Sequence, residues 1–166
     1  MPVTHTTAGT PVGELTLVAE DGELTGVYFP HHWYRPDPDT FGPRADTGFE
    51  DVTAQLAEYF AGGRERFNLP LGLRGGAFQL RVWERISRIP YGQTVSYGDL
   101  ARELGEGTLA KDVGAAVGRN PLSVIVPCHR VVGKDGRLTG YAGGLGRKRF
   151  LLDLEESVAG RVGQLF

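Results

Sequence analysis

The sequence contains a single cysteine, Cys128, and this scarcity excludes an internal disulfide. It also lacks any apolar run that approaches the roughly 20 residues of a membrane-spanning helix. Its first residues show no basic stretch followed by an apolar one, so we expect no secretory signal. We therefore expect a protein of a reducing compartment, cytoplasmic or, in a eukaryote, nuclear. A chain of 166 residues is long enough for one compact unit or two small ones.

The first half of the chain has no cysteine, so a zinc site there would have to use His5, His31 and His32 with nearby acids. A His-His pair in a proline-rich loop is more often solvated or packed than bound to a metal. The glycines between residues 140 and 146 do not sit in a strand-to-helix phosphate loop. We therefore expect neither a metal nor a cofactor.

The net charge of -2 conceals an uneven distribution along the chain. Residues 1–76 carry a net charge of -6, residues 77–149 carry +6, and residues 150–166 carry -2. A basic half joined to an acidic half is typical of a protein that meets a polyanion with one face. Ordinary solvated charge is the alternative, so the distribution favours nucleic acid without requiring it.

The first half alternates short apolar-polar patterns with one helical pattern. Asp21 and Gly22 form a typical hairpin turn between two strands, and Gly62 and Gly63 end the helix. The expected elements are strands over 13–19 and 24–29, an irregular loop with four prolines over 30–47, a helix over 50–61, a strand over 67–71 and a glycine-rich linker over 72–76. Residues 1–76 are thus predicted to form a small α/β domain with its linker.

The second half begins with an apolar helical face and continues into two short helices joined by a glycine-containing turn. Ser96, three residues before Asp99, is a good N-cap for the first of this pair. Such a pair describes a helix-turn-helix, although helix pairs also occur as plain packing. The expected elements of this mostly α domain, residues 77–166, are helices over 77–89, 94–103 and 109–118, an apolar strand ending at Cys128, and a terminal helix from near Leu145.

Cys128 is followed directly by His129 and Arg130. A cysteine is a good nucleophile only as its thiolate, which needs a base or a positive charge nearby. Adjacent side chains on an extended strand point to opposite faces, so His129 would have to act through a water or a bent backbone. A buried structural cysteine is the alternative reading of these residues.

Three spaced motifs resemble the O6-alkylguanine-DNA alkyltransferase family, the methylated-DNA-protein-cysteine methyltransferases. They are Pro-Cys-His-Arg-Val-Val-Gly over 127–133, Gly-Arg-Asn-Pro over 118–121 and Pro-Tyr-Gly-Gln-Thr-Val-Ser-Tyr over 90–97. The match runs without an evident gap from Phe78 to Glu155. The first half fits only in general shape, as the small ribonuclease H-like α/β domain that this family carries.

This resemblance implies direct-reversal DNA repair. The helix-turn-helix would bind double-stranded DNA in the minor groove and flip an O6-alkylated guanine out of the stack, since the alkyl carbon cannot be reached inside a duplex. The alkyl group would then pass to Cys128 in a single-turnover suicide reaction. We expect a protein that is monomeric in solution, while clustering along DNA stays open.

The resemblance also implies the catalytic residues. Cys128 is the nucleophile, and His129 acts on it through a water. Glu155 matches the carboxylate that holds the histidine, and Asn120 matches the hinge asparagine that ties the helix-turn-helix to the active-site strand. Tyr97 matches the tyrosine that meets the flipped nucleotide and donates a proton to the guanine ring as O6 leaves.

The remaining implied contacts fall into two groups. Backbone groups of Cys128 and Val131 would accept from the guanine amine, the backbone N–H of Ala142 would meet O6, and the glycines after it would leave room for the base. The implied substrate-binding residues are Val131, Tyr141, Ala142, Gly143 and Lys148. The implied DNA-binding residues are Lys111, Ser96, Ala110, Gly114, Ala115 and Arg119.

Two positions depart from the family pattern. Lys111 stands where the family has an arginine inserted into the duplex in place of the flipped base, and a lysine cannot stack as a guanidinium plane does. Its stem can still act as a wedge, so we expect flipping with weaker capture of the duplex. Ala142 stands where some members have serine, and little should change because the family contact is through the main chain.

Other functions and roles stay open at this point. Cys128, His129 and Glu155 would also serve a thiol hydrolase or acyltransferase. A non-catalytic, lesion-sensing DNA-binding protein is the third class, and the retained cysteine argues against it. Residue by residue, Tyr97 could be helix core, Asn120 a turn residue, and Glu155 a solvated or capping side chain of the terminal helix.

Overall fold

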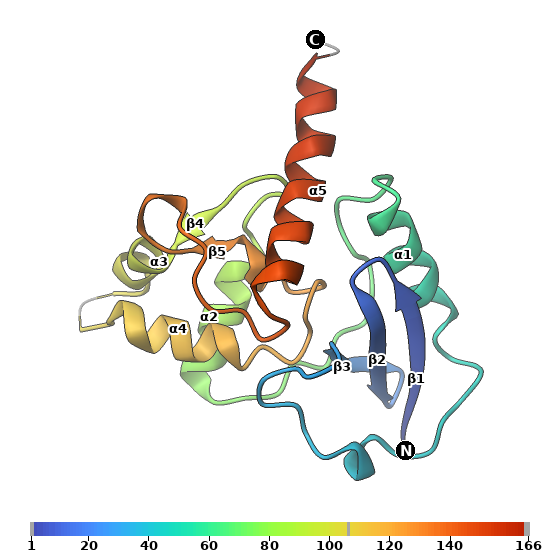
Figure 1. Ribbon diagram of the computed structural model, residues 1–166. Helices are drawn as coiled ribbons and strands as arrows, with labels where there is room; N and C mark the ends of the chain where they lie inside the picture. Colours follow the sequence, from blue (N-terminus) through green and yellow to red (C-terminus); the bar gives the residue numbers. More distant parts are fainter. Residues whose placement is uncertain (1, 106, 165–166) are drawn as a thin grey trace.

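The computed structural model describes residues 2–105 and 107–164, with side chains up to residue 160. Its N-terminal part is a three-stranded antiparallel sheet of β1 (Val3–Thr10), β2 (Gly13–Glu20) and β3 (Glu23–Tyr28), in that order. Figure 1 shows this sheet beside α1 (Glu50–Phe60). The predicted strands and helix are confirmed, and Asp21 and Gly22 turn the hairpin with φ of 54° and 79°.

Strand β1 was missed in the sequence. It pairs with β2 along its whole length, from Val3 opposite Glu20 to Thr10 opposite Gly13. Its burial is intermediate throughout apart from the exposed Gly9. Half-buried residues on both faces leave little hydrophobic alternation along the strand, which explains why the pattern gave no signal.

The predicted strand over 67–71 is wrong. Only Leu71 forms an isolated bridge, with Leu24. Pro70 offers its carbonyl to the N–H of Leu24 but has no N–H of its own, so a ladder cannot continue through it. The proline-rich segment 30–47 is irregular as expected, apart from a short 3-10 helix, η1 (Pro38–Phe41).

The C-terminal part is mostly helical (Figure 1). It contains α2 (Ala77–Ile86), α3 (Tyr97–Leu104) and α4 (Ala110–Gly118), and α4 packs against both α2 and α3. The hydroxyl of Ser96 accepts from the N–H of Asp99, so the predicted cap of the first helix of the helix-turn-helix is confirmed. Strand β4 (Val95–Ser96) precedes this helix and pairs in parallel with β5 (Val131–Val132).

The predicted strand leading to Cys128 is wrong. Residues 123–125 form a turn, Val124 has a φ of 72°, and Cys128–Arg130 is a 3-10 helix, η2. The apolar run is buried as a turn because its backbone groups bond within the run, with the N–H of Val126 donating to Leu122 O. Cys128 and His129 are therefore not on an extended strand, where their side chains would point to opposite faces. The backbone between them is bent, as the sequence allowed.

Helix α5 (Leu145–Gln164) begins where the sequence predicted. Figure 1 places it between the sheet with α1 on one side and α2, α3 and α4 on the other. One continuous core joins the halves, in which residues of the sheet such as Leu17 cluster with Trp83 of α2 and Leu151 of α5. No helix in the described ranges is long and apolar enough to cross a membrane.

Candidate active site

Cys128 is the buried centre of the site, with 2% of its surface exposed. Burial raises the pKa of its thiol, while Asn120, Lys148 and Tyr141 act in the opposite direction. The resting group is therefore a thiol whose ionised form is stabilised by the groups around it. Such a thiol becomes a nucleophile when a base accepts its proton.

Asn120 holds the turn that carries the cysteine. Its amide Nδ2 donates to Val126 O over 2.9 Å, and its Oδ1 accepts from the N–H of Leu122 over 2.9 Å. Both bonds are buried. Asn120 lies two residues after the end of α4, so this side chain ties the helix-turn-helix to the turn before Cys128. Its expected hinge role stays a prediction.

His129 and Glu155 form a buried pair. His129 Nε2 lies 2.6 Å from Glu155 Oε2, and the two side chains are 0% and 1% exposed. Burial lowers the pKa of His129 more than Glu155 raises it, and Arg130 and Lys148 lower it further. A neutral imidazole that donates Nε2–H to the carboxylate keeps the lone pair of Nδ1. No atom of the described residues hydrogen-bonds to that Nδ1.

Glu155 is held by more partners than the sequence indicated. Arg130 donates to both carboxylate oxygens, through Nε at 2.8 Å and Nη2 at 3.1 Å, and the N–H of Gly92 donates to Oε1 at 3.2 Å. Burial alone would raise the pKa of this carboxyl, but His129 and Arg130 outweigh it and hold the pKa well below its usual range. Glu155 is therefore a permanent carboxylate rather than a cap of α5.

Tyr59 of α1 is a further partner that the sequence reasoning missed. Its hydroxyl donates to Glu155 Oε2 over 2.6 Å, across 96 positions of sequence. By its spacing from Val52 and Leu56, Tyr59 falls on the apolar face of the helix predicted over 50–61, which indicates packing only. A tyrosine rather than a phenylalanine in a fully buried stripe is the one signal that could have identified it, because a buried hydroxyl needs a partner.

Lys148 is fully buried and holds the segment of residues 139 and 140 in place. Its Nζ donates to Thr139 O over 2.9 Å and lies 3.4 Å from Gly140 O. Burial lowers the pKa of Lys148 to about 8, and the charge of Cys128 opposes that shift. The ammonium is thus positioned both to hold the carbonyls of residues 139 and 140 and to stabilise a thiolate.

A cavity of about 380 Å³ opens between the helix-turn-helix and the segment held by Lys148. Tyr141 lines it and also neighbours the thiol, and its hydroxyl has no hydrogen-bonding partner of regular geometry among the described residues. Trp33, from the proline-rich loop, is a wall that the sequence reasoning missed. The lining is Trp33, Tyr97, Ala110, Lys111, Gly114, Val117, Gly118, Thr139, Gly140, Tyr141 and Ala142.

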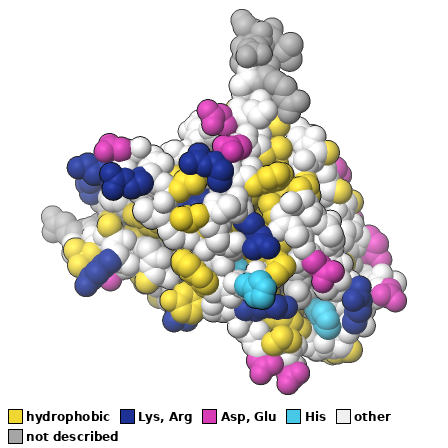
Figure 2. Space-filling view, in the orientation of Figure 1, with side chains coloured by type: hydrophobic (Ala, Val, Ile, Leu, Met, Phe, Trp, Pro, Cys, Tyr) yellow, Lys and Arg dark blue, Asp and Glu magenta, His cyan; other side chains and the backbone are white. Residues whose placement is uncertain are grey.

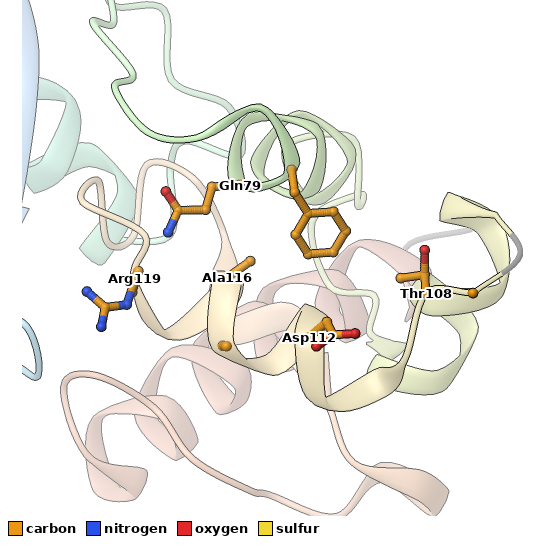
Figure 3. A pocket seen from close by; sticks show the side chains of 8 residues that line it. Gln79, Thr108, Asp112, Ala116 and Arg119 are labelled. Atoms are coloured by element: carbon orange, nitrogen blue, oxygen red, sulfur yellow. The ribbon is translucent and has the colours of Figure 1, made fainter.

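Two of the expected DNA-binding residues, Ala115 and Arg119, also line a second cavity, against α2 (Figure 3). Ala115 lies four residues after Lys111, so these two residues share one exposed face of α4. The guanidinium of Arg119 also lies 4.0 Å over the ring of Tyr34. Figure 2 shows Lys and Arg side chains interspersed with hydrophobic ones on the helical side of the visible face.

Two expected substrate residues also have structural roles. A Cβ on Gly143 would lie 2.4 Å from the ring of Phe29, so the packing of the two halves also requires a glycine here. Val131 is fully buried and pairs with Val95 between β5 and β4, directly after the helix that holds Cys128.

Two of the three histidines weighed for zinc have protein partners. His5 Nδ1 lies 2.9 Å from Gly42 O, and His32 accepts from the N–H of Phe29 over 3.2 Å. Burial lowers the pKa of His32 to about 4. Within the described part of the chain, no group of three or more His, Cys, Asp or Glu side chains could hold a metal ion.

Comparison with known families agrees with this geometry. A family model described as 6-O-methylguanine DNA methyltransferase, DNA binding domain, matches residues 77–157, and one described as 6-O-methylguanine DNA methyltransferase, ribonuclease-like domain, matches residues 3–73. The chain belongs to this methyltransferase family. The expected fold, a ribonuclease-like α/β domain followed by a helical DNA-binding domain, is confirmed.

Relatives in the family match most of the chain. The methylated-DNA–protein-cysteine methyltransferase of Mycobacterium tuberculosis is 46% identical over 156 residues, 93% of each chain. That of Bacillus subtilis, called constitutive, is 41% identical and covers 91% of this chain and 94% of its own. The crystal structure of Mycobacterium tuberculosis OGT in complex with DNA has a TM-score of 0.88 at 45% identity and covers 93% of this chain and 94% of its own.

Proposed function

We propose that this protein repairs O6-alkylguanine in double-stranded DNA by transferring the alkyl group to Cys128. The observation that supports the proposal is a buried thiol whose neighbours can each assist one step of the reaction. Lys148 supplies positive charge, and His129 presents an unpaired Nδ1 because Glu155 holds its Nε2. The cavity beside the helix-turn-helix supplies a place for a flipped base.

The transfer needs a proton to leave the thiol. The proton passes to Nδ1 of neutral His129 through a bridging water, and Glu155 stabilises the imidazolium that forms. The thiolate then attacks the alkyl carbon, so that an S–C bond forms as the C–O6 bond breaks. The permanent charge of Glu155, fixed by Arg130, keeps the imidazole in the tautomer that this step requires.

The leaving oxygen becomes part of a guanine that needs one proton. Tyr97 lies at the start of α3 and lines the cavity, and burial raises the pKa of its hydroxyl, so it is a proton donor at neutral pH. It donates a proton to the guanine ring as the C–O6 bond breaks. Exchange with solvent then returns Tyr97 and His129 to their starting states, so the balance is a thioether and an unmodified guanine.

The cavity explains why this chemistry takes place on an extrahelical base. Lys111, Ala110 and Gly114 of α4 line the same cavity as Tyr97 and Tyr141, so the helix of the helix-turn-helix that meets DNA also borders the reaction site. With α4 in the minor groove, a base rotated out of the stack enters between these residues. Lys111 fills the gap left in the duplex, where the family has arginine.

Incubation with duplex DNA that contains one O6-methylguanine tests the proposal. The protein should gain the mass of one methyl substitution, and peptide mapping should place it on Cys128. The guanine should be recovered unmodified in the DNA. A protein that binds the duplex without gaining mass, or a modification on any other residue, would refute the assignment.

A further inference from the structure

The hydroxyl of Tyr59 shares one carboxylate oxygen with the catalytic histidine. Tyr59 Oη and His129 Nε2 each lie 2.6 Å from Glu155 Oε2. Tyr59 comes from α1 in the N-terminal domain, whereas His129 and Glu155 belong to the C-terminal domain. The N-terminal domain therefore contacts the base of the reaction through a buried hydrogen bond to its carboxylate.

The surroundings keep this hydroxyl where it is. Tyr59 is 0% exposed, and its ring packs against Phe60, Phe67 and Tyr91 at centroid distances of 5.2 to 6.2 Å. Burial and the neighbouring charge of Glu155 raise the pKa of the Tyr59 hydroxyl far above its ordinary value, so it is always a donor. A permanent donor to a permanent carboxylate fixes the orientation of that carboxylate.

We propose that Tyr59 is a positioning residue for alkyl transfer, whose hydroxyl orients Glu155 and moderates its hold on His129. The inference rests on the proposed function, since it assigns a role to His129 as the base. Tyr59 and His129 share the negative charge of Oε2 with Arg130 Nη2, and each donor on this oxygen weakens the hydrogen bonds of the others. Tyr59 therefore keeps the Glu155–His129 pair from stabilising the protonated imidazole too strongly.

The sign of the effect follows from this sharing. Without the Tyr59 hydroxyl, only Arg130 Nη2 still shares Oε2 with His129, so more of the charge of Oε2 acts on the imidazole and raises its pKa. Only the neutral imidazole can accept the thiol proton, so the rate falls as pH falls through that pKa. The titratable and charged groups around the pair are Cys128, Arg130, Tyr141, Lys148, Tyr59 and Tyr91. All except Tyr59 are the same in the variant described next.

The test is the pH dependence of the second-order rate constant for alkyl transfer from free O6-benzylguanine, which reports the groups of the free protein. Tyr59→Phe removes only the hydroxyl and keeps the ring in its packing. On the acid side of the pH–rate profile, the midpoint is the pH at which the rate constant falls to half its maximum. This midpoint should move to higher pH by about half a unit to one unit. The final amount of alkylated Cys128 gives the active concentration, so a loss of folded protein does not alter the midpoint.

A second variant works in the opposite direction and keeps the hydrogen bond. 3-Fluorotyrosine at position 59 is a stronger donor, so the midpoint should move to lower pH. Tyr28→Phe is the matched control, because it makes the same change at a buried tyrosine of the N-terminal sheet that stacks on Phe41. It should leave the midpoint unchanged.

Opposite shifts of the midpoint in the two Tyr59 variants would support the inference. A midpoint that is unchanged in both variants, with only lower thermal stability in Tyr59→Phe, would show that Tyr59 is a packing residue and would overturn it. If the unaltered protein itself transfers no alkyl group, the proposed function fails first. Transfer by the unaltered protein together with unshifted variants would overturn this inference alone.

Discussion

The backbone N–H of Trp33 donates to Ala142 O over 3.0 Å, so the proline-rich loop is attached to the segment that walls the cavity. A Cβ on Gly140 would lie 3.5 Å from the Trp33 ring, which places the indole against the same segment. The ring is 52% exposed and lines the cavity beside Lys111. The N-terminal domain thus contributes a wall to a cavity whose other lining residues belong to the C-terminal domain.

Trp33→Ala should slow alkyl transfer from free O6-benzylguanine on the order of tenfold, because an aromatic wall that contacts the ligand is lost. The thermal midpoint should change little, since half of the ring already meets solvent. Tyr34→Ala is the control: that ring is 62% exposed and does not line this cavity. Equal rates for Trp33→Ala and Tyr34→Ala would show that Trp33 does not contact the base.

Lys111 should matter for duplex DNA and not for the free base. Lys111→Ala should slow transfer from duplex O6-methylguanine far more than transfer from free O6-benzylguanine, because only the duplex includes an unstacking cost of a few kcal/mol. Lys111→Arg should raise duplex affinity or rate, since a guanidinium stacks where an ammonium does not. Lys134→Ala, at another exposed lysine, controls for the loss of charge. Equal losses on both substrates would assign Lys111 to the fold.

Glu155 should make stability depend on pH. Its pKa is held low in the folded protein, so its stabilising effect is complete above its unfolded value near 4.3 and is lost as pH falls below that value. Glu155→Gln leaves the buried Arg130 without a counter-charge and should cost about 3 to 5 kcal/mol of unfolding free energy at pH 7.

The difference between Glu155→Gln and the unaltered protein should shrink as the pH of urea unfolding is lowered from 7 to 3. Glu156→Gln is the matched control, because it makes the same change at the exposed neighbouring position. A difference that stays constant over this pH range would contradict the permanent charge assigned to Glu155.

DNA binding should be weakly selective for sequence and should fall steeply with salt. Phosphate contacts position such a protein and release counterions, so the logarithm of affinity falls linearly with the logarithm of salt concentration. Fluorescence anisotropy with an undamaged duplex at several salt concentrations measures the slope. A salt-independent affinity, or strong selectivity for one undamaged sequence, would indicate a regulator.

The elements that the sequence predicted best are those with local signals. Gly62 and Gly63 follow α1, Ser96 caps α3, and Asp21 and Gly22 make the hairpin. The prediction of a strand leading to Cys128 was wrong, because a short apolar run fits a buried turn as well as a strand. The Asn120 side chain favours the turn by bonding to Val126 and Leu122, six and two residues further on, and a pattern of apolar residues does not show such side-chain bonds.

The sequence predicted the part of the site that resembles the family. It did not predict the part that forms where the two domains meet. The motifs identified Cys128, His129 and Glu155, which do lie together. Tyr59 and Trp33 reach the site only through the packing of the N-terminal domain on the C-terminal domain. Their contacts depend on how the two parts dock, and periodicity along one segment does not determine docking.

The central claim is that Cys128 accepts one alkyl group and is consumed by doing so. The most direct measurement is the methyl transferred from excess duplex O6-methylguanine, followed by intact mass for the unaltered protein and for Cys128→Ser. We predict a plateau of one methyl per protein molecule, no transfer to Cys128→Ser, and a DNA affinity of the variant within a few-fold of the original. Repeated turnover without added mass, as in a thiol hydrolase, or methyl transfer to the serine variant would contradict the account.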